Sequence, residues 1–167
     1  MSRPPRLRGF SYRGPYVNAL TASAAERRPI MTTPAVLREI GDALNEHLTL
    51  HRFGLIAFCV MPDHLHLIVR GLDAESCLVR FVRGFKQASG HRMRRYHGIR
   101  LWQEGFFDHV LRNEAAVERH VKYILENPVR AGLVDALEAW AYSDANLEGL
   151  RTFPRRAVRG AEADRRS

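Results

Sequence analysis

His64 and His66 are two imidazoles separated by a single leucine. The apolar residues 55–61 predict a buried strand before them, and Pro62-Asp63 supplies turn chemistry. Because side chains alternate across a strand, we expect both imidazoles on one face of a sheet and Leu65 on the other. Two imidazoles that converge on one face can bind a divalent metal ion. The competing interpretation is a half-exposed histidine pair with no ligand.

Tyr123 lies near the end of a helix expected over residues 114–126, with Asn113 as its cap. The apolar stripe of that helix comprises Val117, Val121, Ile124 and Leu125. Tyr123 lies roughly 100° or more from the centre of this stripe, so its hydroxyl is available for chemistry. An amphipathic tyrosine at the rim of the core is the alternative.

Asn127 lies one helical turn after Tyr123 and precedes Pro128. This pair is typical of a helix start, with Asn127 as cap and a helical turn over 129–134. A side-chain amide is also a plausible oxygen ligand for Mg²⁺ or Mn²⁺. Both roles remain open for Asn127.

The elements that must position these residues follow from hydrophobic periodicity and turn signals. The predicted order is a strand over 16–22, a helix starting with Thr33 and Pro34, strands over 55–61 and 64–70, a helix over 74–96, a strand over 106–111 and the helix over 114–126. The order β-α-β-β-α-β predicts an α+β fold with a ferredoxin-like split β-α-β sheet and an added C-terminal helix that carries Tyr123. We expect two helices on one sheet face, against Leu65, Leu67 and Val69. His64 and His66 would then lie on the open face.

The charge distribution predicts a polyanionic partner. The net charge is +8, and residues 76–103 contain no Asp or Glu. The predicted helix over 74–96 carries the candidate DNA-binding residues Arg80, Arg83, Lys86, Gln87 and Arg94. Phosphate contacts from this face would give salt-sensitive, sequence-tolerant affinity. An ordinary solvated helix face is the alternative.

Composition and length predict one soluble domain with flanking basic segments. We expect a basic arm over 1–14, a domain over 15–150 and a flexible arginine-rich tail over 151–167, for which a DNA-binding arm is an equal alternative. The sequence has no apolar run of membrane-spanning length, no secretory signal and only two cysteines, Cys59 and Cys77. These features predict a cytoplasmic protein.

Three segments in this order and spacing resemble the REP-associated tyrosine transposases, a single-tyrosine branch of the His-hydrophobic-His DNA-nicking enzymes. The segments are 60–69 with the His-Leu-His motif, 101–109 with Leu-Trp-Gln and Phe-Asp-His, and 123–134 with Tyr-Ile-Leu-Glu-Asn-Pro-Val-Arg-Ala-Gly-Leu-Val. The resemblance covers about residues 16–147. It is weaker over the first strand and over 141–146, and the tail after Leu150 matches nothing.

The resemblance implies roles for individual residues. Tyr123 would be the nucleophile that forms a 5′-phosphotyrosine, and His64, His66 and Asn127 would hold Mg²⁺ or Mn²⁺. The implied substrate is single-stranded DNA folded into an imperfect hairpin, and the branch favours a monomer over a dimer. His120 is a candidate base for the tyrosine proton, with a solvated surface histidine as its alternative.

Two other functions are also compatible with the sequence. The same element order suits an RNA-recognition domain or a non-catalytic hairpin-binding protein, although no matching aromatic signature is present. A metal-dependent hydrolase that activates water would need no covalent link to Tyr123.

Overall fold

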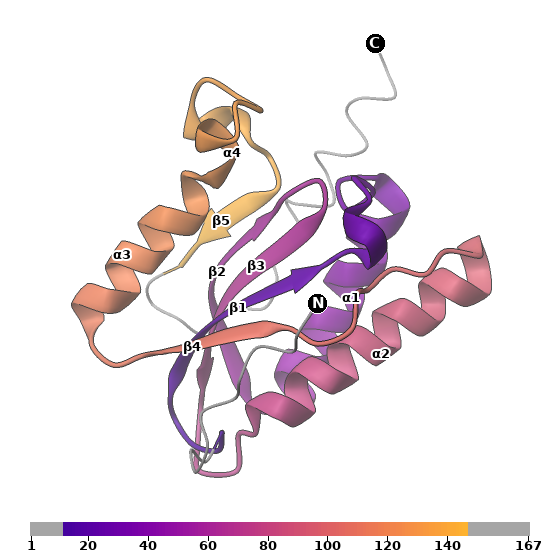
Figure 1. Cartoon of the computed structure of the whole chain (residues 1–167). Coiled ribbons are helices and arrows are strands. Elements are labelled where there is room, and N and C mark those ends of the chain that lie inside the picture. The colour runs from indigo at the N-terminus through magenta and orange to yellow at the C-terminus, as the bar shows by residue number, and fades with distance from the viewer. Residues whose placement is uncertain (1–11, 147–167) are drawn as a thin grey trace.

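The structure is a computed structural model that describes residues 12–146. Its elements are β1 (Val17–Ser23), η1 (Ala25–Arg27), α1 (Pro34–Leu50), β2 (Phe53–Val60), β3 (His64–Gly71), α2 (Leu78–His97), β4 (Phe107–Leu111), α3 (Glu114–Leu125), α4 (Asn127–Arg130), η2 (Leu137–Ala139) and β5 (Ser143–Ala145). The fold is therefore mixed, with helices packed on a sheet (Figure 1).

The sheet has five strands in the order β4-β1-β3-β2-β5, and all its pairings are antiparallel. β2 and β3 form the predicted hairpin, in which Val60 pairs with Leu65 and Phe53 with Gly71. The edge strand β5 was not predicted, because three residues are too few to show a strand period. It pairs with β2, and the indole of Trp140 nearby donates to the carbonyl oxygen of Val60 at 3.1 Å.

Helices cover both faces of the sheet. α1 and α2 lie on one side and α3 on the other (Figure 1). Leu65, Leu67 and Val69 are buried in the cluster shared with α1 and α2, as predicted. The prediction that the opposite face stays open is wrong, because α3 buries Val121 and Ile124 against it. An amphipathic helix of this kind must cover its apolar stripe, and this sheet face is where it does so.

The start of α2 also differs from the prediction. The helix begins at Leu78 rather than at residue 74, because residues 73–76 form a turn. Asp73 Oδ1 accepts hydrogen bonds from the backbone N–H groups of Glu75 and Ser76, at 2.9 and 3.1 Å. Such side-chain bonds to nearby backbone groups compete with helix formation. The helix ends at His97, and Gly98 follows it with a φ of 66°, which suits the left-handed cap position.

The flanking segments lie mainly outside the described range. Most of the predicted basic arm and all of the predicted tail over 151–167 lie outside it. The last residues of the arm belong to the fold, since Gly14 N donates to Ser76 O at 3.0 Å and Leu78 N donates to Tyr12 O at 3.0 Å. Within residues 12–146, no helix has the length and apolar character needed to cross a membrane.

Candidate active site

The two imidazoles of β3 converge on one point. His64 Nε2 and His66 Nε2 lie 3.0 Å apart, and the rings meet edge to face. The other nitrogen of each ring is held by a neighbour: His64 Nδ1 lies 2.6 Å from Asp63 Oδ1, and His66 Nδ1 lies 3.0 Å from Thr21 Oγ1. Neighbours that fix Nδ1 orient Nε2, which is the arrangement usual for metal-binding histidines.

His66 is partly buried, and positively charged side chains lie near it. Desolvation chiefly lowers the pKa of His66 to about 4, and His64, Arg130 and Arg27 lower it further, while Asp63 raises it. The imidazole is therefore neutral near pH 7, which is the form in which a histidine binds a metal ion. Arg27 is itself paired with Asp63, at 2.9 Å from Nε to Oδ2.

Tyr123 lies outside the apolar stripe of α3, as expected, and 49% of it is exposed. The guanidinium carbon of Arg130 lies 4.0 Å from the centroid of its ring. His120 is a near neighbour, with a ring centroid 6.3 Å from that of Tyr123, and it stacks on His109 at 5.6 Å. The phenol is thus accessible and flanked by a cation and an imidazole.

Asn127 does not cap a helix through its side chain. α4 begins at Asn127 itself, and Glu126 continues the helical backbone from α3, with φ −77° and ψ −10°. Because the chain barely leaves the helical conformation, there is no extended cap position for the amide to serve. Instead Asn127 Oδ1 accepts from Arg130 Nη2 at 2.6 Å, and the buried Nδ2 has no hydrogen-bond partner.

The end of α3 and the histidine pair share one side of the sheet. Ile68, two residues after His66 on β3, packs in one cluster with Val121 and Ile124 of α3. Because strand side chains alternate, His64 and His66 lie on the same face as Ile68. The charge of Arg130 also reaches His66. The fold therefore brings the predicted nucleophile, amide and imidazoles to one side of the sheet.

The donor set can be compared with the needs of a divalent ion. Within residues 12–146, no group of three or more His, Cys, Asp or Glu side chains could hold a metal. The two converging Nε2 atoms nevertheless fit two positions of a metal ion, and an amide oxygen suits a third. Such a set leaves further positions for substrate oxygens and water. The residues present thus fit a metal ion whose coordination is completed by oxygen atoms of the substrate.

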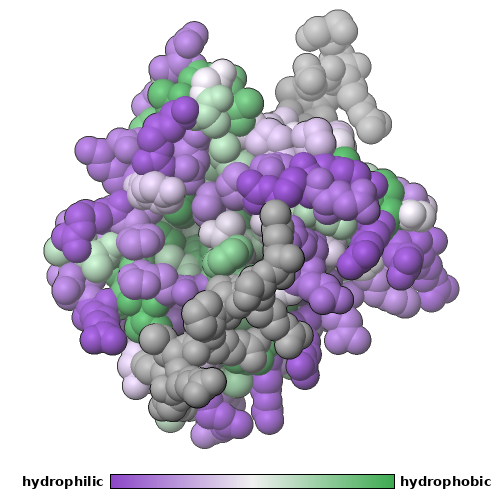
Figure 2. Space-filling model, viewed as in Figure 1, coloured by the Kyte–Doolittle hydropathy of each residue, from purple (hydrophilic) through white to green (hydrophobic). Residues whose placement is uncertain are grey.

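The predicted DNA-binding face is exposed but lies on the other side of the sheet. Arg80, Arg83, Gln87 and Arg94 of α2 are exposed, and the outer surface of α2 is hydrophilic in Figure 2. Because α2 packs on the face opposite to α3, a DNA strand must reach around the sheet edge to touch this surface and the histidine pair together.

Lys86 has local partners instead of an exposed ammonium group. Its Nζ donates to the carbonyl oxygens of Gln103, at 2.8 Å, and Gly105. It also lies 5.6 Å from the ring centroid of Trp102. Burial lowers the pKa of Lys86 to about 8. The geometry therefore favours a structural role, in which Lys86 ties the loop before β4 to α2.

Sequence reasoning missed four residues that shape the site: Thr21, Arg27, Asp63 and Arg130. Asp63 and Arg130 left a signal, since one adjoins His64 and the other follows Asn127 by three residues on a helical turn. Thr21 and Arg27 left none. They reach the histidines only because β1 pairs with β3, with Thr21 opposite His66.

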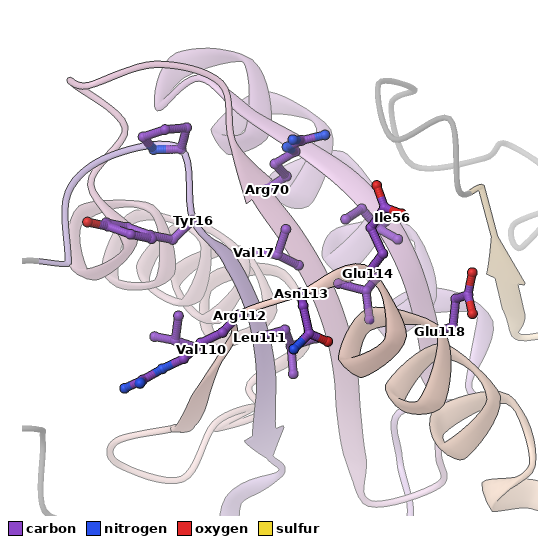
Figure 3. Close-up of a pocket in the computed structure, with 12 residues that line it drawn as sticks. Tyr16, Val17, Ile56, Arg70, Val110, Leu111, Arg112, Asn113, Glu114 and Glu118 are labelled. Carbon is purple, nitrogen blue, oxygen red and sulfur yellow. The ribbon is translucent and has the colours of Figure 1, made fainter.

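A pocket of about 560 Å³ lies elsewhere on the same sheet face (Figure 3). Residues of β1, β3 and the first turns of α3 line it, among them Tyr16, Arg70 and Glu118. It is at the opposite end of the strands from the histidines, since Arg70 pairs with Val17 and His64 pairs with Ser23. It contains none of the predicted site residues.

Comparisons with known proteins show the family of the chain. The sequence profile of the family described as "Transposase IS200 like" matches residues 19–127, which include His64, His66, Tyr123 and Asn127. Because this match spans more than half of the chain, the chain belongs to the IS200-like transposase family. Transposases cut and transfer DNA strands, so this is a family of DNA-processing enzymes.

Three individual proteins are similar to the chain. A REP-associated tyrosine transposase from Escherichia coli K12 is 30% identical over 109 residues, which cover 65% of this chain and 59% of that protein. A Haemophilus influenzae protein, provisionally given the same name, is 26% identical over 119 residues, 64% of this chain and 67% of that protein. The solved structure of a REP-associated tyrosine transposase bound to a REP hairpin superposes with a TM-score of 0.72 at 25% identity, covering 86% of this chain and 82% of the other.

Proposed function

We propose that the chain is a single-stranded DNA transposase that cuts and rejoins DNA at hairpin sequences through Tyr123. The observation that carries the proposal is the convergence of His64 Nε2 and His66 Nε2, 3.0 Å apart, on the sheet face that α3 covers. The similar structure bound to a REP hairpin supports hairpin DNA as the substrate class. The strand order β4-β1-β3-β2 supports a ferredoxin-like split β-α-β core, to which α3 adds the nucleophile.

The chemistry would proceed by direct attack of the tyrosine. Tyr123 Oη forms a bond to phosphorus, the bond from phosphorus to the 3′ oxygen breaks, and that oxygen leaves as a 3′-hydroxyl after taking up a proton. A phenol, with a pKa of about 10, is a better leaving group than a sugar hydroxyl. A 3′-hydroxyl can therefore attack the 5′-phosphotyrosine and release Tyr123. The covalent bond conserves the phosphodiester, so that rejoining needs no nucleotide triphosphate.

Residues around the nucleophile would prepare this step. His64, His66 and Asn127 would hold Mg²⁺ or Mn²⁺, which supplies Lewis acidity at the phosphate when it is bound. Asp63 and Thr21 orient the imidazoles, and the low pKa of His66 keeps that ring unprotonated at neutral pH. The positive charge of Arg130 would attract the phosphate. His120, 6.3 Å from Tyr123 between ring centroids, is a candidate acceptor for the phenol proton.

The proposed site would be complete within one chain. The charge of Arg130, which touches Tyr123, reaches His66 within the same chain. This arrangement favours a monomer that uses its own tyrosine. The predicted phosphate contacts of Arg80, Arg83, Gln87 and Arg94 would add affinity at a distance from the cut.

A gel assay for a covalent adduct tests the proposal. End-labelled hairpin DNA with Mn²⁺ should give a protein–DNA adduct that survives denaturation, and Tyr123→Phe should abolish it. Tyr96→Phe is the matched control, because Tyr96 is exposed and also has an arginine, Arg95, 5.7 Å from its ring. That variant should retain the adduct.

A non-catalytic hairpin-binding protein is the second candidate. The hydrogen bond from Arg130 to Asn127 Oδ1 favours it, because the third proposed ligand is occupied. Hairpin binding without any cut product would support this candidate. A cut product without an adduct, even under trapping conditions, would instead indicate attack by water.

A further inference from the structure

Arg130 contacts both the proposed nucleophile and the proposed amide ligand. Its Nη2 donates to the carbonyl oxygen of Tyr123 at 2.9 Å and to Asn127 Oδ1 at 2.6 Å. The guanidinium carbon lies 4.0 Å from the centroid of the Tyr123 ring. One side chain thus joins the backbone and ring of Tyr123 to the amide of Asn127.

The charge of Arg130 is not neutralised locally. The residue is exposed, and within residues 12–146 no carboxylate forms an ion pair with it. Arg27, the other arginine whose charge reaches His66, is paired with Asp63. Among these two arginines, Arg130 is therefore the one whose charge is left for a ligand. A guanidinium prefers a phosphate, which it can bind through two parallel hydrogen bonds, to a neutral amide oxygen.

The hydrogen bond from Arg130 weakens the ability of Asn127 Oδ1 to bind a metal ion. An amide oxygen that accepts a short bond from a guanidinium is a poorer donor to a second cation, since the two positive charges repel each other. Asn127 Nδ2 is buried without a partner, so the present orientation of the amide depends on Arg130. Removing the guanidinium would free the oxygen.

We propose that Arg130 holds Tyr123 and Asn127 in the DNA-free protein and exchanges Asn127 Oδ1 for a phosphate oxygen of the bound DNA, where it acts as a catalytic residue. The proposal rests on the proposed function. Arrival of the phosphate then frees the amide oxygen at the moment when the site needs a third ligand. The guanidinium remains beside the Tyr123 ring, next to the phosphate that Tyr123 attacks.

Mn²⁺ binding to the DNA-free protein tests the exchange directly. Electron paramagnetic resonance measures the dissociation constant of Mn²⁺ for the wild type, Arg130→Met and Arg130→Met/Asn127→Ala. We expect several-fold tighter binding in Arg130→Met and loss of that gain in the double variant. Arg130→Lys, which keeps the charge on a shorter side chain, should give a partial gain. Arg38→Met on α1, which removes the same charge from an exposed site, should bind Mn²⁺ as the wild type does.

Three results would overturn the proposal: unchanged or weaker Mn²⁺ binding in Arg130→Met, a gain that survives Asn127→Ala, or no Mn²⁺ binding by any form. The adduct assay adds a second criterion. At saturating hairpin, Arg130→Met should form the adduct more slowly by about 10²- to 10³-fold, the usual cost of removing one donor to a transition-state oxyanion. An unchanged rate would also overturn the proposal. If the wild type forms no adduct, the proposed function fails, and the Mn²⁺ measurements alone decide the role of Arg130.

Discussion

At the scale of single residues, the site depends on neighbours that hold the functional side chains in place. Asp63 and Thr21 fix the Nδ1 atoms of the two histidines, and Arg130 fixes the oxygen of Asn127. Asp63 and Thr21 can act without touching the DNA, whereas Arg130 is proposed to release Asn127 Oδ1 and bind a phosphate of the DNA. The effect of Asp63 and Thr21 is to decide which nitrogen of each imidazole faces the substrate.

The neutral state of His66 predicts a pH dependence of stability. The unfolded chain binds this proton with a pKa of 6.5, and the folded protein with a pKa of about 4. The contribution of His66 is therefore complete above pH 6.5 and is lost as the pH falls towards 4. The expected loss is roughly 3 kcal/mol in the free energy of unfolding. Urea unfolding of the wild type and His66→Asn across this range measures it, and the variant should show a shallower decline. Equal declines would contradict the burial assigned to His66.

The histidine pair and Tyr123 could be predicted from local sequence, because strand alternation and helix periodicity act over a few residues. The partners of these residues could not. Thr21 precedes His66 by 45 residues, and only the pairing of β1 with β3 brings them together. Lys86 shows the converse error: its position on a basic helix face predicted a phosphate contact, while the loop that follows α2 supplies its partners.

At the scale of elements, the α1–α2 contact depends on the missing side chain of Gly84. A Cβ atom there would lie 2.5 Å from Nδ1 of His47, which is buried and stacks on His51 at 5.4 Å. Helix periodicity predicted both helices but not this approach, because the spacing between two helices is a property of their packed pair.

Gly84→Ala should therefore destabilise the fold even though alanine is the better helix former. Overpacking of this kind costs about 1–3 kcal/mol in the free energy of unfolding. Gly90→Ala on the same helix is the matched control, because its Cβ would lie 3.3 Å from Trp102 Cδ1. It should stay within about 1 kcal/mol of the wild type, since helix propensity offsets the mild contact. Chemical denaturation of both variants checks the difference, and equal effects would contradict close packing at Gly84.

At the scale of the whole molecule, the sheet separates two surfaces. The α3 side carries the histidines and the tyrosine, and the α2 side carries the basic face. Sequence reasoning placed each set of residues on the correct element. The relative placement of the two sets could not be predicted from the sequence. The prediction left the second sheet face uncovered and did not say where α3 packs.

This separation predicts that affinity and cutting can be changed independently. Replacing Arg80, Arg83 and Arg94 by Gln should weaken hairpin binding while leaving the adduct rate at saturating DNA unchanged. The slope of log affinity against log salt should fall by about 0.7–0.9 for each phosphate group that the variant no longer binds. Lys86→Met is the control and should lower the melting temperature without changing that slope. Filter binding at several salt concentrations measures the slopes. A slower rate of adduct formation at saturating DNA, with unchanged hairpin affinity, would contradict the assignment of affinity to the α2 surface and cutting to the α3 side.

The central claim is that Tyr123 and the histidine pair form one DNA-cutting site. Mass spectrometry of the trapped adduct, after proteolysis and nuclease digestion, tests it most directly. The account predicts a 5′-linked nucleotide on the peptide that contains Tyr123, and no such peptide from a His64→Ala/His66→Ala variant that still binds the hairpin. A nucleotide on another tyrosine, or an undiminished adduct in the histidine variant, would contradict the account.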